Sequence, residues 1–261
     1  MKLLEKINEK LRKSYWMLGV GLLLVVAMSA ARVKRHSHTK ELVVQIASLE
    51  TEGGGFLIME RDVKRIIQNS FVEEIDGMDL NQVQLDRMEK VLEDDPFVKD
   101  AEVWIDANNK VHIKVLQRQP IVRIIDNNGL NYYFDKTGRK MPTSKYATAR
   151  VPVATGYLPA YFNEFRDSAN PLNDVFKLAK FLNKNELLSA MISQISVGKS
   201  GEITLIPEFG KTKIILGKAD DLPGKFKKLL IFYKEAMPHK GWRKYQTINL
   251  KFANQVVCKR W

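Results

Sequence analysis

The longest uninterrupted hydrophobic stretch lies near the N-terminus, where residues 14–31 carry no charged side chain. Eighteen residues at about 1.5 Å each make a helix of about 27 Å, close to the hydrocarbon thickness of a bilayer. Tyr15 and Trp16 lie at one end of the stretch, and such amphipathic rings favour the level of the lipid headgroups. The pattern predicts a single transmembrane helix over residues 14–31 that contacts the lipid bilayer, with Tyr15 and Trp16 as membrane-interface anchors.

A cleaved secretory signal peptide is the alternative for this stretch, because Ser29, Ala30 and Ala31 fit a small-residue cleavage site. The length of the stretch and its basic head favour an anchor. Five basic residues precede the stretch and four follow it, which slightly favours a cytoplasmic N-terminus. We therefore predict a short cytoplasmic head over residues 1–13, a basic juxtamembrane linker over 32–40, and a folded body on the far side of the membrane, in a bacterial periplasm.

Residues 41–116 predict the order strand, helix, helix, strand, strand. A β-prone run at 42–46 comes first, and apolar residues at helical spacing predict a helix over 59–69. A second helix is predicted to begin after Asn81 as its N-cap and to end at Asp95-Pro96. The last two strands are predicted over 98–105 and 111–115, joined by a turn at 106–109. These elements predict a βααββ domain over residues 41–116.

Residues 117–261 predict a mixed α/β domain. Pro120 must lie outside a central ladder or on an edge, so residues 117–124 are predicted to cross between the two domains. One helix is predicted to open at Asn170-Pro171, and another to open at Asp221 and stop at Pro238. Strands are predicted over 132–135, 151–156, 192–197, 203–206 and 212–216.

The C-terminus predicts an antiparallel hairpin, with strands over 245–252 and 255–259 around Ala253-Asn254. The predicted fold class is therefore α+β. It comprises a single N-terminal transmembrane helix, a βααββ domain, and a mixed α/β domain that ends in an antiparallel edge hairpin.

Charge changes sign along the chain, which carries 42 Lys and Arg against 30 Asp and Glu, a net charge of +12. Residues 1–40 carry +7, residues 41–116 carry −9, and residues 117–261 carry +14. A nucleic-acid-binding protein could contain one basic domain, but it would not explain an acidic domain behind a basic, apolar N-terminus. We therefore predict no nucleic-acid partner.

The sequence lacks the residues that common active sites and metal sites need. One cysteine, Cys258, excludes an internal disulfide and a Cys-based zinc site, and four histidines leave little for a His-rich metal centre. Gly198-Lys199-Ser200 is no phosphate-binding P-loop, because Ser193 stands where that motif needs glycine. No nucleophile elbow is present, and the acidic residues of 117–261 form no paired-carboxylate motif, although carboxylates distant in sequence could still meet in space. We predict no catalytic residue, no metal and no cofactor.

In the order of these elements, the chain resembles the FtsQ (DivIB) family of bacterial division proteins over essentially its full length, and residues 41–116 resemble a POTRA domain. The motifs that carry the resemblance are the junction at 95–103, the crossing Gln117-Arg118-Gln119-Pro120-Ile121 and the ending at 242–252. The family often has an acidic residue where Gln117 stands. It also usually has aspartate, leucine, arginine and an aromatic residue where Asn249, Leu250, Lys251 and Phe252 stand.

The resemblance implies a non-catalytic, single-pass protein of the inner membrane at the division septum, with the bitopic proteins FtsB and FtsL as partners. It implies that other division proteins can dock on the POTRA-like domain. It also implies that an edge strand near the C-terminus accepts a strand of FtsB. The matching residues are Lys251, Phe252, Ala253, Asn254, Gln255, Val256, Val257, Cys258 and Lys259.

Docking at an edge strand is also expected on physical grounds, because an edge strand offers unpaired N–H and C=O groups to an incoming strand. Residues 211–260 contain 13 basic and 3 acidic side chains, which would attract an acidic partner, although a solvated face is the ordinary alternative. Core packing is the ordinary alternative for Val256, Val257 and Cys258. A second hypothesis is a membrane-anchored envelope domain that binds an anionic cell-wall polymer through its +14 half.

Overall fold

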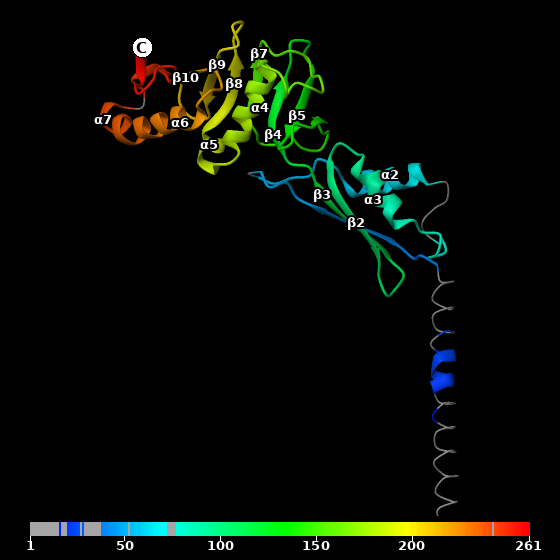
Figure 1. Cartoon of the computed structure of the whole chain (residues 1–261). Coiled ribbons are helices and arrows are strands. Elements are labelled where there is room, and N and C mark those ends of the chain that lie inside the picture. The colour runs from blue at the N-terminus through cyan, green and yellow to red at the C-terminus, as the bar shows by residue number, and fades with distance from the viewer. Residues whose placement is uncertain are drawn as a thin grey trace, which may run out of the picture. The chain divides into compact units, whose positions relative to one another are not determined.

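The computed structural model describes residues 38–51, 53–71, 77–241 and 243–261, together with helical residues at Trp16, 20–26 and Met28 (Figure 1). Among these residues, no helix is both long enough and apolar enough to span a bilayer. The predicted head, Tyr15, about half of the predicted span 14–31 and most of the linker 32–40 lie outside the described residues.

Contacts divide the chain into two compact units that interleave along the sequence. The first unit contains the described parts of Met1–Gln45, Glu60–Asp94 and Ala101–Val115. The second contains those of Ile46–Met59, Asp95–Asp100 and Leu116–Trp261.

The first two helices and three strands of the folded body follow the predicted order strand, helix, helix, strand, strand. They are β1 (Leu42–Ala47), α2 (Glu60–Ser70), α3 (Leu85–Glu93), β2 (Val98–Ile105) and β3 (Val111–Gln117). The sheet order is β1-β3-β2, so β3 is the central strand. Its alternate side chains Val111, Ile113 and Val115 are fully buried, as period-2 patterning requires. Helices α2 and α3 cover one face of this sheet (Figure 1).

The start of α3 corrects the sequence prediction, because its N-cap is Gln84 and not Asn81. Asn81 lies in a turn in which Asp79 Oδ1 accepts its backbone N–H at 3.1 Å. The carbonyl of Asp79 also accepts the N–H of Gln82 at 2.8 Å. An aspartate side chain that binds the backbone two residues ahead stabilises a turn in competition with a helix, and this turn delays the helix by one turn.

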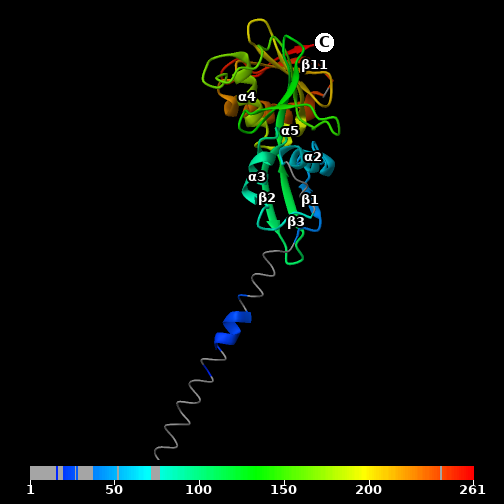
Figure 2. The same cartoon turned by 90° about the vertical axis from the view of Figure 1, so that its right-hand side faces the viewer.

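The second unit is built on a mixed sheet that has nine strands among the described residues, in the order β12-β11-β10-β9-β8-β7-β4-β5-β6 (Figures 1 and 2). Its strands are β4 (Pro120–Ile125), β5 (Asn131–Asp135), β6 (Lys140–Pro142), β7 (Val153–Gly156), β8 (Ile192–Val197), β9 (Ile203–Pro207), β10 (Lys213–Gly217), β11 (Tyr245–Asn249) and β12 (Val257–Arg260). Its helical segments are α4 (Pro171–Leu182), α5 (Glu186–Met191), α6 (Leu222–Ile231), the π-helical turn η1 (Phe232–Ala236) and α7 (Met237–Lys240).

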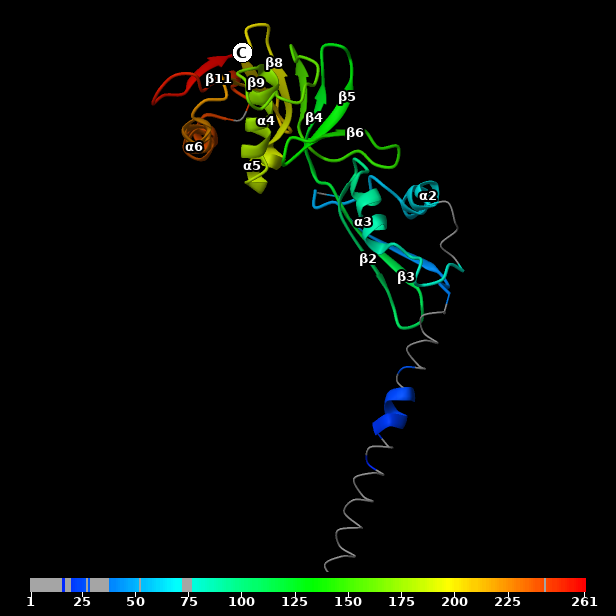
Figure 3. The ribbon, with the colours of Figure 1, turned by 45° about the vertical axis from the view of Figure 1, so that its right-hand side comes forward.

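One face of the nine-stranded sheet is covered by α4 and α6 (Figure 3). Asn170 caps α4 as predicted, with its side-chain oxygen accepting the N–H of Asn173 at 2.9 Å. The two helices meet where the Phe181 and Phe226 rings lie 5.2 Å apart. Their apolar faces join alternate residues of the strands in one core cluster, which includes fully buried Leu178, Leu229 and Ile214.

The opposite face is covered at its β5–β6 end by chain segments that precede the sheet in sequence. Leu49 and Leu57 pack with Tyr133 and Met141 in a second core cluster. Gln117 holds this segment: its side-chain oxygen accepts the N–H of Leu57 at 2.6 Å, and its amide donates to the carbonyl of Ala47 at 2.7 Å. The crossing at residues 117–121 is therefore a buried structural element.

Pro120 is the first residue of β4, which lies between β7 and β5 inside the sheet. The pairing of β4 with β5 shifts register between Pro120 and Val122. A residue without an N–H is tolerated at a strand start or an irregularity, so Pro120 needs no edge strand.

Pro238 does not end the last long helix, contrary to the sequence prediction. Helix α6 continues through η1 into α7, where Pro238 occupies the first turn. The first turn of a helix tolerates proline because its N–H groups have no partner within the helix. The π-helical turn η1 interrupts the regular α-helical hydrogen bonds before Pro238, so a proline is tolerated at that position.

Candidate docking site at the C-terminal edge strand

The nine-stranded sheet has two edges, and they differ in how well they can accept another strand. The β6 edge is three residues long and ends in Pro142, which protects it from strand addition. The other edge, β12, contains no proline. Within the described residues β12 pairs only with β11, so the backbone groups on its outer side have no strand partner.

The pairing of β12 confirms the predicted antiparallel hairpin. Tyr245 lies opposite Arg260 at one end, and Asn249 lies opposite Val257 at the other. Side chains alternate along β12: Cys258 packs against the core, whereas Val257 is 42% exposed. Burial raises the pKa of the Cys258 thiol above its ordinary value, as expected for a partly buried thiol that packs against apolar core residues.

The nine residues matched to the family's docking edge fall into two parts of the hairpin. Val257, Cys258 and Lys259 lie in β12, whereas residues 251–256 form the connecting loop. Asn254 has φ 55°, consistent with a turn at the predicted Ala253-Asn254. Phe252 is 44% exposed, and Val256 is half-buried against the core. The segment thus combines an exposed aromatic ring in the loop with the short open strand that follows the loop.

The loop is held in place by a lysine that the sequence did not single out. Lys228 Nζ, on α6, donates to the carbonyl of Phe252 at 2.6 Å and lies 3.4 Å from that of Leu250. The N–H of Lys251 donates to Asn249 Oδ1 at 3.0 Å. The loop backbone at Phe252 is therefore held by a hydrogen bond from α6. Lys228 and Phe252 come together only in the folded chain, so no local sequence pattern predicted this contact.

Lys251 is already paired within its own unit. Its Nζ lies 2.5 Å from Glu202 Oε1, and this hydrogen bond holds the pKa of the Glu202 carboxyl below its ordinary value. Gly217, with φ 79°, lies beneath the stem of Lys251, where an added Cβ would come within 2.8 Å of Lys251 Cγ. This internal pair helps to position the loop, and contact of Lys251 with a partner stays a prediction.

Other cations of the basic C-terminal region also have internal roles. Lys225 is buried, donates to the carbonyl of Lys218 at 2.9 Å and pairs with Asp220. Lys259 and Arg260, by contrast, are exposed and make no ion pair within the described part of the chain. These two cations on β12 are therefore available to a partner at this edge.

Comparison with known proteins identifies the family. A family model described as FtsQ/DivIB, C-terminal related, matches residues 119–259, more than half of the chain. The chain belongs to the FtsQ/DivIB family. A POTRA-like domain model matches residues 39–116, the part that contains β1, α2, α3, β2 and most of β3.

A curated relative supports the family assignment. The cell division protein FtsQ of Rhodothermus marinus is 26% identical over 175 residues, which are 63% of this chain and 61% of the relative. The chain thus matches less than two thirds of that relative's length. The FtsQ/DivIB match includes all nine residues of the predicted docking segment, 251–259.

Proposed function

We propose that this FtsQ/DivIB chain is a non-catalytic scaffold of the bacterial division machinery that docks a partner strand on the outer edge of β12. The partner is a bitopic division protein of the FtsB type, in complex with FtsL. The observation that carries the proposal is an open, proline-free edge strand whose preceding loop is held by Lys228. Because the loop is already ordered, docking avoids part of the entropic cost of fixing it.

Strand addition assigns separate roles to backbone and side chains. The outward N–H and C=O groups of β12 supply main-chain hydrogen bonds, and side chains beside them supply specificity. Phe252 and Val257 are the exposed apolar candidates, at 44% and 42% exposure. Lys259 and Arg260 favour an acidic partner segment and speed its encounter.

The same proposal places the chain in the inner membrane at the septum, spanning once through residues 14–31 with a cytoplasmic N-terminus. Its support is a set of exposed apolar side chains in the described helical residues, each more than half exposed: Leu22, Leu23, Leu24, Val25, Val26 and Met28. Trp16, 73% exposed, suits an interface anchor, and Tyr15 keeps that role as a prediction. Residues 41–116 would form the POTRA-like domain that docks further division proteins, and 117–261 the domain that docks FtsB.

A matched pair of proline variants tests the strand docking. Successive N–H groups of a strand point to opposite edges. One of the two variants Cys258→Pro and Lys259→Pro therefore removes a hydrogen bond to β11, and the other removes an N–H group that faces outward. Full-length variants in lipid nanodiscs are titrated with the extracytoplasmic segment of an FtsB-type partner. The variant that keeps the parental melting temperature should lose binding. Unchanged binding in that variant would rule out pairing at this edge.

An anionic cell-wall polymer is the second candidate ligand, favoured by the +14 charge of residues 117–261. Polymer binding through many charge contacts should fall steeply with salt and should tolerate Phe252→Ala. Docking of a strand should depend on Phe252 and respond weakly to salt. A fluorescent fusion tests location: it should gather at midcell, and deletion of residues 14–31 should abolish this.

A further inference from the structure

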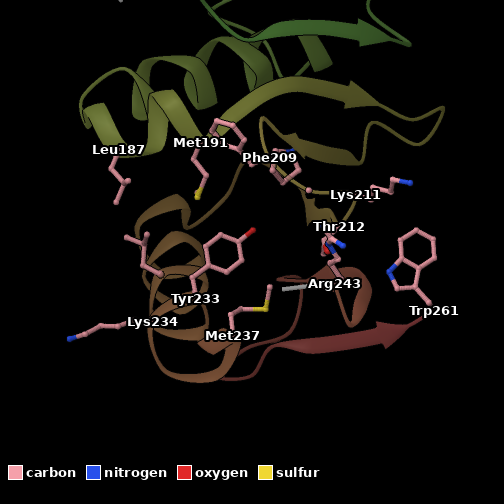
Figure 4. Close-up of a pocket in the computed structure, with 13 residues that line it drawn as sticks. Leu187, Met191, Phe209, Lys211, Thr212, Tyr233, Lys234, Met237, Arg243 and Trp261 are labelled. Atoms are coloured by element: carbon pink, nitrogen blue, oxygen red, sulfur yellow. The ribbon is translucent and has the colours of Figure 1, made fainter. Parts of the chain in front are cut away.

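A groove of about 1320 Å³ lies in the second unit, at the end of the β11–β12 hairpin opposite the 250–256 loop (Figure 4). Arg243 and Trp261 line it, and they flank the Tyr245–Arg260 pair that marks this end. The remaining wall comes from α5, the turn between β9 and β10, and the α6–η1–α7 segment. The groove thus uses neither the outer edge of β12 nor Phe252.

The inner surface of the groove is apolar and adaptable. Met191, Leu230, Tyr233 and Met237 line it, and Met237 is only 2% exposed. Burial raises the pKa of Tyr233 to about 12, in keeping with an apolar surrounding. Methionines have flexible thioether chains that adjust to different apolar partners.

Large apolar side chains also stand exposed around the groove (Figure 4). Leu187 is 63% exposed, Phe209 87% and Trp261 67%. A small molecule inside the groove would leave these rim side chains in water. A partner that extends over the rim would bury them, and exposed apolar groups gathered at one place mark such interaction surfaces.

The charged residues that line the groove are all basic: Lys211, Lys234 and Arg243. Among the described residues, Lys234 has one distant ion pair, 3.9 Å from Glu235, with both side chains largely exposed. No ion pair within the described part of the chain engages Lys211 or Arg243. An occupant with carboxylates at its margins would therefore be favoured.

We propose that this groove binds an acidic amphipathic helix of a protein partner, with apolar side chains inside the groove and carboxylates facing Lys211 and Arg243. A helix that binds in a groove has apolar side chains at positions i, i+3 or i+4 and i+7. These side chains lie on one face of the helix, and that face contacts the groove. The site is separate from strand docking, so one assembly can hold the chain at both ends of the β11–β12 hairpin.

The test uses a designed fluorescent peptide of about 16 residues, with leucines at helical anchor spacing and glutamates elsewhere. The full-length protein is held in nanodiscs of zwitterionic lipid, and binding is followed by fluorescence anisotropy. Two controls are a peptide with the same composition but leucines spread around the helix, and one with lysines in place of glutamates. The acidic amphipathic peptide should bind at least about tenfold more tightly than either control.

Surface variants then locate the binding. Phe209→Ala, Leu187→Ala and Lys211→Glu should each weaken binding by about tenfold, because interface anchors carry most of the affinity. Ile231→Ala and Lys227→Glu are the matched controls, since both residues are exposed on α6 and neither lines the groove. These controls should leave binding unchanged, as should the proline variant that blocks the outer edge of β12.

Four outcomes would overturn the proposal. The scrambled peptide could bind equally well, or the groove variants could bind like the controls. Loss of binding in the β12 proline variant would place the peptide on the strand edge instead. If dodecyl phosphate binds and the acidic peptide does not, the groove is a site for anionic amphiphiles and the helix assignment is wrong.

Discussion

Lys251 Nζ lies 2.5 Å from Glu202 Oε1, so the first residue of the predicted docking segment forms an ion pair with the residue that precedes β9. The two side chains are 40% and 45% exposed, so solvent screening makes the pair weak by itself. The ion pair is important because it positions the loop that carries Phe252.

A charge swap separates positioning by Lys251 from direct contact. Lys251→Glu should weaken FtsB-type binding, because two carboxylates would then repel and displace the loop. Adding Glu202→Lys should restore most of the affinity if Lys251 acts through the loop. Calorimetric titration of the two single variants and the double variant provides the measurement. A double variant as weak as Lys251→Glu would show that the lysine itself meets the partner.

Lys228 offers a second test of loop order. Lys228→Met removes the donor to the Phe252 carbonyl and should lower the free energy of unfolding by about 1 kcal/mol. Amide hydrogen exchange should speed up across residues 251–256 and remain slow in β9. Lys227→Met, one residue earlier on the exposed side of α6, is the control and should change neither quantity.

Gln117 makes contacts that an acidic residue cannot reproduce. Its amide donates to the carbonyls of Ala47 and Gly55, at 2.7 and 3.3 Å, while its oxygen accepts the Leu57 N–H. Gln117→Glu would place a carboxylate against two carbonyl oxygens in a fully buried site. We expect a loss of about 2–4 kcal/mol in urea unfolding, with Gln45→Glu, an exposed position, near neutral.

A comparison of Gly156 with Gly129 distinguishes the cost of a steric clash from the cost of backbone strain. It has φ 103°, and a Cβ there would lie 2.2 Å from the carbonyl oxygen of Val197 on the neighbouring strand. Gly129 also has positive φ, 76°, but no atom lies within 4 Å of its added Cβ. Gly129→Ala should cost about 1 kcal/mol, and Gly156→Ala should cost clearly more. Equal shifts in melting temperature would contradict a steric clash at Gly156.

Asp135 should make stability depend on pH in the acid range. Burial alone would raise the pKa of Asp135, but hydrogen bonds from Thr137 and Arg118 outweigh burial and lower it overall. A carboxyl with a lowered pKa contributes stability above its unfolded pKa of about 3.9, and this contribution is lost as pH falls through the folded value. At pH 7, Asp135→Asn should cost about 3 kcal/mol, because buried Arg118 loses its partner charge.

The measurement for Asp135 is urea unfolding of both proteins at several pH values. The difference in unfolding free energy between the parent and Asp135→Asn should be constant from pH 7 to about 5 and should narrow below about pH 4. A difference that does not depend on pH would mean that the Arg118–Asp135 pair does not contribute through charge.

Sequence patterning predicted the long elements of the fold well. Period-2 burial along β3 and helical spacing along α2, α4 and α6 follow from local chemistry, and each appears in the structure within a few residues. The short elements β6 and α5 escaped prediction because three to six residues carry too little periodic signal. Asn81 and Pro238 were misjudged because a neighbouring Asp79 turn and a π-helical turn decide those boundaries.

The sequence by itself determined the order of the elements, the terminal hairpin and the charge of each segment, because these depend on residues close together in the chain. Only the tertiary structure decided that the other edge of the sheet is the protected strand β6, since an edge strand is one that lacks a neighbour on one side among the described residues. It also decided that Lys225, Lys228 and Lys251 act inside the fold. Their partners lie up to 49 residues away, and no local pattern records a contact that chain folding alone creates.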